Sequence, residues 1–151
     1  MVRSAGDCPF CRMGKHELNH VPVLEDREVM AIMDLYPATP GHVLVIPKKH
    51  IETLYEMPAD LGARIMSAAI MLAKVIKAKL SPEGLNLIQA NEITAGQTVA
   101  HFHLHIVPRY QGDPVMLQFG HGSTPESAAE LERIASLLKN GLSLEAKACV
   151  D

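Results

Sequence analysis

The sequence predicts an α+β fold, in which an antiparallel sheet of about five strands carries helices packed on one side. Three observations lead to this prediction. Short apolar runs typical of strands follow one another closely and are joined by turn residues. One long segment has apolar residues at three- and four-residue spacing, as in an amphipathic helix. More strand-like runs follow that helix, and a second helical pattern closes the chain.

The first half of the chain holds three predicted strands and the long helix. The strand-like runs lie at 21–24, 29–33 and 42–47. Two prolines and a glycine in 37–41 interrupt the chain before the third run, as such residues do in turns. The helical pattern covers 61–80, and Pro58 fits its first turn. The sequence Ser-Pro-Glu-Gly at 81–84 ends this helix.

The second half predicts two further strands, at 85–89 and 100–107, with a loop at 91–97 between them. A last helix follows, with Thr124 as its N-cap and a proline directly after it. No repeat, low-complexity tract or linker divides the sequence. We therefore expect a single domain over residues 1–151, with the C-terminal helix and tail at 124–151.

Charge and hydropathy exclude several classes of partner. The chain has 151 residues and a formal net charge of −3, whereas a general nucleic-acid binder carries a basic excess. The longest apolar stretch, 68–73, is far too short to cross a bilayer. The residues before Asp7 lack the apolar core of a secretory signal. We expect a cytoplasmic protein with no nucleic-acid or membrane partner.

Three of the eight histidines alternate in one predicted strand: His101, His103 and His105. Because side chains alternate across a strand, these imidazoles would share one face, roughly 7 Å from one to the next, with the apolar residues between them facing a core. They can be an ordinary polar face, a metal site, or a centre for nucleophilic and acid–base chemistry on phosphate. The upstream Gly-Gln-Thr at 96–98 favours phosphate, since an amide and a hydroxyl suit phosphate oxygens.

The pair Cys8 and Cys11 forms a Cys-x-x-Cys motif near the start of the chain. No predicted strand precedes it, so a thioredoxin-like redox pair is disfavoured and half of a zinc site is favoured. A tetrahedral zinc site needs two more ligands, and the chain has no second cysteine pair, so histidines must complete the site. His16 and His20 are candidates because they lie close to the cysteines in sequence.

Three segments together resemble the histidine-triad (HIT) nucleotide-binding family. Residues 96–109, GQTVAHFHLHIVPR, are similar to its signature sequence. Residues 34–50, DLYPATPGHVLVIPKKH, resemble its second characteristic segment. Residues 8–11, CPFC, resemble the zinc knuckle of its bacterial-type members. The similarity covers about residues 8–110, and the linked motifs are more specific than any one alone.

This resemblance implies an enzyme that cleaves nucleoside phosphates at the α-phosphorus through a nucleotidyl-histidine intermediate. Its substrate would be an adenosine or other purine nucleotide, such as a dinucleoside polyphosphate, a phosphoramidate or an adenylylated compound. His103 matches the nucleophile, His105 a phosphate-contacting histidine and His42 the upstream active-site histidine. Asp34 matches the acceptor of the ribose hydroxyls. The other matched nucleotide contacts are Asn91, Gln97 and Thr98.

The resemblance also implies a structural zinc ion and a homodimer. The matched zinc ligands are Cys8, Cys11, His50 and His101. Three other functions remain as alternatives: a nucleotidyl transferase or phosphorylase, a nucleotide-binding adaptor without activity, and a zinc protein whose triad imidazoles all bind metal.

Overall fold

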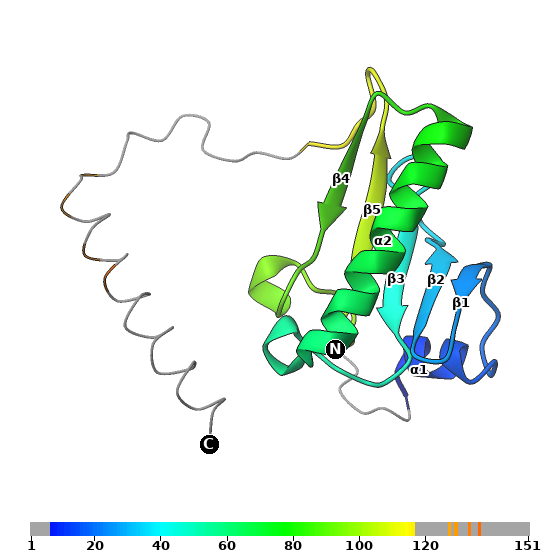
Figure 1. Ribbon diagram of the computed structural model, residues 1–151, viewed down its shortest axis with the longest axis vertical. Coiled ribbons are helices and arrows are strands. Elements are labelled where there is room, and N and C mark those ends of the chain that lie inside the picture. The colour runs from blue at the N-terminus through cyan, green and yellow to red at the C-terminus, as the bar shows by residue number, and fades with distance from the viewer. Residues whose placement is uncertain (1–6, 117–126, 128, 130–132, 134–135, 137–151) are drawn as a thin grey trace. The chain divides into compact units, whose positions relative to one another are not determined.

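The structure, a computed structural model, describes residues 7–116 and, further along the chain, residues 127, 129, 133 and 136. Figure 1 shows the long helix α2 lying across a sheet of five strands. In chain order the elements are α1 (Pro9–Gly14), β1 (Pro22–Glu25), β2 (Val29–Met33), β3 (Val43–Pro47), the 3₁₀ helix η1 (Leu54–Glu56), α2 (Ala59–Leu80), β4 (Gly84–Ile88), the 3₁₀ helix η2 (Ile93–Ala95) and β5 (Leu104–Arg109).

The sheet has the order β1-β2-β3-β5-β4, and every neighbouring pair is antiparallel. The predicted α+β class with a five-stranded antiparallel sheet is therefore confirmed. The non-sequential step brings β5 between β3 and β4, with Leu44 of β3 opposite His105 of β5. Because the two strands are antiparallel, the segment after β3 and the segment before β5 meet at one end of this central strand pair.

Helix α2 packs on one face of the sheet. Its buried residues recur at three- and four-residue spacing, as an apolar stripe requires: Leu61, Ile65, Ala68, Ala69, Leu72 and Ile76. They contact alternate residues of the strands, including Val29, Val45 and Ile106. Each buried Leu or Ile side chain stabilises the fold by about 1.5–3 kcal/mol, so this stripe fixes α2 on the sheet.

Helix α1 lies on the opposite face. Its residues Phe10 and Cys11 belong to a second buried cluster together with the strand residues that point away from α2, among them Met30, Ile32 and Leu44. Helix α1 is not predictable from the sequence, because six residues starting at a proline are too few to show helical periodicity. The cysteine pair thus lies on the face of the sheet away from α2.

The predicted strand 100–107 is wrong at its start, because β5 begins at Leu104. The backbone before it bonds elsewhere: the Phe102 N–H donates to the Ile51 carbonyl at 2.6 Å, and the His101 N–H donates to the Val99 carbonyl at 2.8 Å. These bonds hold residues 100–103 against the segment after β3 instead of in the ladder. Only His105 of the three alternating histidines is a strand residue.

The chain divides into two units, 1–115 and 116–151. Most of the predicted C-terminal helix lies outside the described residues, and the described Ala129, Arg133 and Ser136 have helical backbone. Among the described residues, none of the helices is both long and apolar enough to cross a membrane.

Candidate functional site

His103 is buried directly before β5, and its hydrogen bond fixes its tautomer. Its Nδ1 lies 2.8 Å from the carbonyl oxygen of His101. A carbonyl can only accept, so Nδ1 carries the proton and Nε2 carries the lone pair. Burial lowers the pKa of His103 below its ordinary value of 6.5, partly offset by this hydrogen bond. The ring is therefore neutral near pH 7, with an unprotonated nitrogen available for attack.

His42 and His105 form a second fixed pair beside His103. The Ala38 N–H donates to His42 Nδ1 at 3.1 Å, so the proton of neutral His42 is on Nε2. His42 Nε2 lies 2.9 Å from His105 Nδ1, and the N–H of His42 donates to it. The proton of neutral His105 is then on Nε2, and the ring centroids of His103 and His105 are 4.8 Å apart. A lone pair and an N–H donor thus lie on adjacent rings.

Burial also lowers the pKa values of this second pair. The pKa of His105 falls to about 4 because of burial first and of the neighbouring His103 and His42 second. The pKa of His42 is lowered by burial, against the opposing effect of Asp34. Neutral imidazoles can keep the donor–acceptor chain that fixes their tautomers, whereas a proton on His105 Nδ1 would break it.

Asp34 joins this cluster from the end of β2. Its Oδ2 lies 3.5 Å from His42 Nε2, and its Oδ1 accepts a 2.8 Å hydrogen bond from the Tyr36 N–H. The turn that follows ends at Gly41, whose φ is +87°. A Cβ at Gly41 would collide with Leu80, so the turn that brings His42 to Asp34 requires glycine there.

The other three predicted nucleotide contacts belong to a separate part of the site. The Gln97 side chain donates to the Glu52 carbonyl and accepts from the Glu92 N–H, each at 2.7 Å. Asn91 accepts from the Leu54 N–H at 2.7 Å and bonds to Gln89. Thr98 is exposed. Gln97 and Asn91 thus hold the loop after β4 to the segment before α2, and hydrogen bonds do not join them to the imidazoles described above.

A cavity of about 480 Å³ opens beside Gln97. It is lined by Gln97, Ala100 and residues of the two 3₁₀-helix segments, and three of its lining residues are acidic: Glu52, Glu56 and Glu92. The loop 91–97 and the segment after β3 form its walls, so the cavity joins two parts of the chain that flank the histidine segment.

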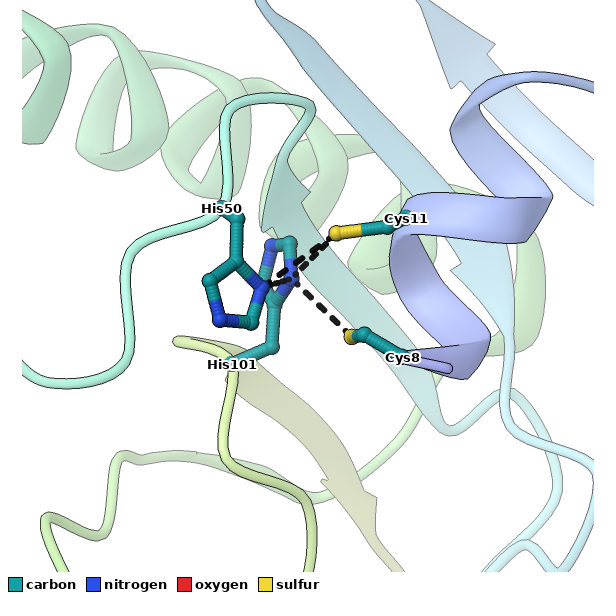
Figure 2. Close-up of side chains that lie close together, drawn as sticks. All are labelled: Cys8, Cys11, His50 and His101. Carbon is teal, nitrogen blue, oxygen red and sulfur yellow. Dashed lines mark hydrogen bonds between the residues drawn. The ribbon is translucent and has the colours of Figure 1, made fainter. Parts of the chain in front are cut away.

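A second cluster brings together Cys8, Cys11, His50 and His101 (Figure 2). Three parts of the chain contribute: the start of α1, the segment after β3 and the segment before β5. His101 Nδ1 lies 3.4 Å from Cys8 Sγ and 3.5 Å from Cys11 Sγ. His50 Nδ1 lies 3.3 Å from both Cys11 Sγ and His101 Nδ1. Both imidazoles therefore direct the same nitrogen at the two sulfurs.

These distances fit a tetrahedral zinc ion. Zinc bonds of about 2.3 Å to sulfur and 2.0–2.1 Å to nitrogen give tetrahedral edges of about 3.6 Å for sulfur–nitrogen and 3.3 Å for nitrogen–nitrogen. His101 Nε2 donates to the Pro47 carbonyl at 2.8 Å, which leaves Nδ1 as a ligand atom. Burial raises the pKa of Cys11 to about 11, and the neighbouring Cys8 is the second cause. Two buried thiols facing two imidazole lone pairs are a donor set that zinc stabilises.

The two clusters are connected at one backbone group and one ring. The carbonyl that fixes the tautomer of His103 belongs to His101. Phe10, between the two cysteines in sequence, packs against both rings, with centroid distances of 5.7 Å to His101 and 5.3 Å to His103. Phe10 is not among the predicted site residues, although its place inside the Cys-x-x-Cys motif is a usable signal. The Ala38 N–H was also missed, because no sequence pattern reports a backbone donor.

A five-stranded antiparallel sheet with ordered imidazoles before its central strands defines a protein of the histidine-triad class. Comparison with known proteins agrees: the family model described as "HIT domain" matches residues 15–112. The chain belongs to the HIT domain family.

The relatives include characterised and uncharacterised proteins. The chain is 41% identical over 113 residues to "Protein hit" of Bacillus subtilis, covering 74% of this chain and 78% of that protein. It is 35% identical over 136 residues to adenosine 5'-monophosphoramidase hnt1 of Schizosaccharomyces pombe, covering 87% and 98%. It is 35% identical over 107 residues to adenylylsulfatase HINT3 of Arabidopsis thaliana, covering 71% of this chain and 54% of that one.

Two solved structures are informative. A HIT family protein from Bacillus anthracis superposes with a TM-score of 0.86 at 35% identity, covering 91% of this chain and 99% of that chain. A zinc-bound histidine triad family protein from Mycobacterium smegmatis gives a TM-score of 0.70 at 29% identity, covering 96% and 99%.

Proposed function

We propose that this protein is a nucleotide hydrolase that cleaves a nucleoside phosphate at its α-phosphorus, with His103 as the nucleophile. The observation that carries the proposal is the 2.8 Å hydrogen bond from His103 Nδ1 to the His101 carbonyl. It leaves a lone pair on Nε2 of a neutral ring, which is what a nucleophilic imidazole needs. His105 carries an N–H on its Nε2, one ring away.

The reaction has two displacements. His103 Nε2 attacks the α-phosphorus, a nitrogen–phosphorus bond forms, and the bond to the leaving group breaks with its electron pair on the leaving group. Water then attacks the same phosphorus, and the nitrogen–phosphorus bond breaks with its electron pair on Nε2, which restores the neutral ring of His103. The proton lost by the attacking water is released to solvent, which supplies the proton that the departing group takes up. The N–H of His105, held by His42, stabilises negative charge on the phosphate oxygens.

Asp34 binds the ribose of the nucleotide in this proposal. Its two oxygens accept hydrogen bonds, which suits the two hydroxyls of a ribose. Leu35 is 81% exposed next to it and offers apolar surface to a purine base. The proposed contacts to the phosphate and the leaving group come from Gln97, Thr98 and Asn91. Gln97 lines the 480 Å³ cavity.

A structural zinc ion completes the site. Cys8, Cys11, His50 and His101 would hold it. The bound ion would cross-link α1 to the segment after β3 and the segment before β5 and would not act on the substrate. The spacing of the four ligand atoms and the zinc-bound relative from Mycobacterium smegmatis support this assignment. With His101 fixed, the carbonyl that orients His103 is fixed as well.

A homodimer in the cytoplasm is the proposed working form. The exposed side of α2 carries Met66, Ile70, Met71 and Val75, and Leu87 is 43% exposed on β4, an edge strand of the sheet. Exposed apolar residues and the outer edge of an edge strand are typical of an interface between two copies. A small-molecule nucleotide is the proposed partner, and neither a nucleic acid nor a membrane is.

Two relatives suggest the leaving groups to test first, since their names describe cleavage of an adenylyl–sulfate and an adenylyl–nitrogen bond. The test supplies adenosine phosphoramidate, adenylyl sulfate and diadenosine tetraphosphate in turn, with and without added phosphate. Release of AMP that His103→Ala abolishes supports the hydrolase. ADP formed only with added phosphate supports a phosphorylase instead. Tight AMP binding without turnover of any substrate would leave an adaptor.

A further inference from the structure

A third histidine cluster lies outside both sites described so far. His16, His20 and Glu25 each place one ligand atom within 4.8 Å of those of the other two. His16 Nε2 is 3.4 Å from Glu25 Oε1, and the rings of His16 and His20 are nearly parallel, with centroids 6.1 Å apart. These residues join the end of α1 to β1. Both histidines are candidate partners of the cysteines by their sequence position, but the structure brings His50 and His101 to the cysteines instead.

The end of α1 is built to hold His16 in this place. The Glu17 N–H bonds to the Arg12 carbonyl at 2.8 Å and the His16 N–H to the Met13 carbonyl at 2.9 Å, the two bonds of a Schellman motif. His16 occupies the left-handed position of that motif, with φ +60°. Glycine is the usual residue there, so a histidine is an uncommon choice for the backbone. Its side chain, 67% exposed, reaches Glu25.

His20 and Glu25 are already prepared as ligands. His20 Nδ1 lies 3.0 Å from the Leu18 carbonyl and must donate to it, so Nε2 of the neutral ring carries a lone pair. Glu25 is ionised because its hydrogen bond with Lys48 lowers its pKa below the ordinary range. Lys48 Nζ lies 2.6 Å from Glu25 Oε1, which leaves the lone pairs of Oε2 for another cation.

We propose that His16, His20 and Glu25 form a second metal site, open to solvent, for a divalent transition-metal ion such as Zn²⁺, Ni²⁺ or Cu²⁺. Two imidazoles and one carboxylate are the donor set that such ions prefer, and hard ions such as Mg²⁺ prefer oxygen ligands alone. With three protein ligands, the remaining coordination positions go to water. The ion would join the end of α1 to β1, and Lys48 would oppose it by its charge.

The test uses the full chain loaded with one equivalent of Zn²⁺, followed calorimetrically while a second equivalent of Zn²⁺ is added. We expect a second binding event in the wild type and a rise in melting temperature with it, because an ion that binds the folded state stabilises that state. His16→Asn and His20→Gln should each weaken the second event by more than about tenfold, or 1.4 kcal/mol. Asparagine tolerates the left-handed backbone of position 16.

Two further variants separate this site from its alternatives. Lys48→Met keeps the aliphatic stem but removes the opposing charge, so it should tighten the second event. His42→Asn changes the imidazole cluster near Asp34, the other two-histidine, one-carboxylate group among the described residues, and should leave the second event unchanged. Any of three results overturns the proposal. The wild type binds only one ion, the second event survives in both His16→Asn and His20→Gln, or the second event is lost in His42→Asn. Unchanged affinity for the second Zn²⁺ in Lys48→Met also overturns the proposal, because this result would mean that Glu25 does not bind the ion.

Discussion

The two histidine clusters on the α1 face of the sheet use the same side chain in opposite ways. In the cluster of Cys8, Cys11, His50 and His101, both imidazoles direct Nδ1 at one point between two sulfurs. In the cluster of His42, His103 and His105, hydrogen bonds occupy both nitrogens of His42 and the Nδ1 of the other two rings. His103 then presents a lone pair on Nε2, and His105 presents an N–H on Nε2. Converging lone pairs suit a metal, whereas alternating donors and lone pairs suit reaction at phosphate.

The partner of the second ring nitrogen, rather than the histidine itself, distinguishes the two roles. His101 and His103 are two residues apart and both buried. His101 donates from Nε2 to Pro47 and offers Nδ1, while His103 donates from Nδ1 to His101 and offers Nε2. The opposite tautomers send one lone pair to the cysteines and leave the other for a substrate.

Removal of the His103 lone pair should have the largest effect on activity. His103→Ala is expected to lower kcat for adenosine phosphoramidate by roughly three orders of magnitude or more, since loss of a nucleophile leaves only binding and charge stabilisation. The zinc content and the AMP affinity should stay close to wild type. His105→Ala, which removes a donor, should slow turnover less. A fall in zinc content in His103→Ala would contradict the separation of the two clusters.

Removal of a metal ligand should act on stability before activity. Cys8→Ser is expected to lose bound zinc and about 3 kcal/mol of folding free energy, which lowers Tm by roughly 10 °C in a chain of this size. Elemental analysis and a thermal melt measure both quantities. Cys149→Ser, which removes the third cysteine, is the matched control and should retain the zinc. Full zinc content in Cys8→Ser would show that the four-ligand assignment is wrong.

Asp34 should discriminate ribose from deoxyribose, with an effect on kcat/KM that is smaller than the effect of His103→Ala on kcat. A carboxylate that loses one hydroxyl partner gives up about 1.4 kcal/mol, so we expect the wild type to prefer AMP-based over 2′-deoxy substrates about tenfold in kcat/KM. Asp34→Asn keeps an oxygen for the Tyr36 N–H and should reduce this preference. Equal kcat/KM for the two substrates in the wild type would make Asp34 a turn residue only.

The buried imidazoles should make stability depend on pH with a predictable sign. The pKa of His105 falls from 6.5 to about 4 on folding, so between these values the unfolded chain binds a proton that the folded chain does not. The contribution of His105 to the free energy of unfolding is therefore constant above pH 6.5 and decreases as the pH falls from 6.5 towards 4. Urea unfolding at pH 7 and pH 5 with saturating zinc measures the loss, which should be smaller in His105→Asn. An equal loss in both proteins would show that His105 does not contribute.

Much of the fold could be predicted from the sequence because its signals are long or repeated. The apolar stripe of α2 repeats over 22 residues, and β2 matches its predicted run of 29–33. The start of β5 could not be predicted, because the alternation of residues 100–107 has the period of a strand whether or not a partner pairs with it. Hydrogen bonds from distant residues, such as Phe102 to the Ile51 carbonyl, decide that boundary.

The sequence predicts which residues form the candidate site better than it predicts their geometry. The motif spacing identifies His103 and His105 as neighbours, but the tautomers depend on the Ala38 N–H and the His101 carbonyl, which any residue type supplies. The meeting of Cys8 with His101, 93 positions apart, requires α1 and the segment before β5 to lie on the same face of the sheet. No local pattern reports such a contact, and only the family resemblance pointed to it.

The stereochemical course at the α-phosphorus shows directly whether His103 attacks it. A nucleoside α-phosphorothioate substrate of known configuration, hydrolysed by the zinc-loaded wild-type protein in oxygen-18 water, gives a product whose configuration reports the number of displacements. Attack by His103 followed by attack of water inverts phosphorus twice, so we predict net retention. Net inversion would mean that water attacks directly, and it would contradict a nucleophilic role for His103.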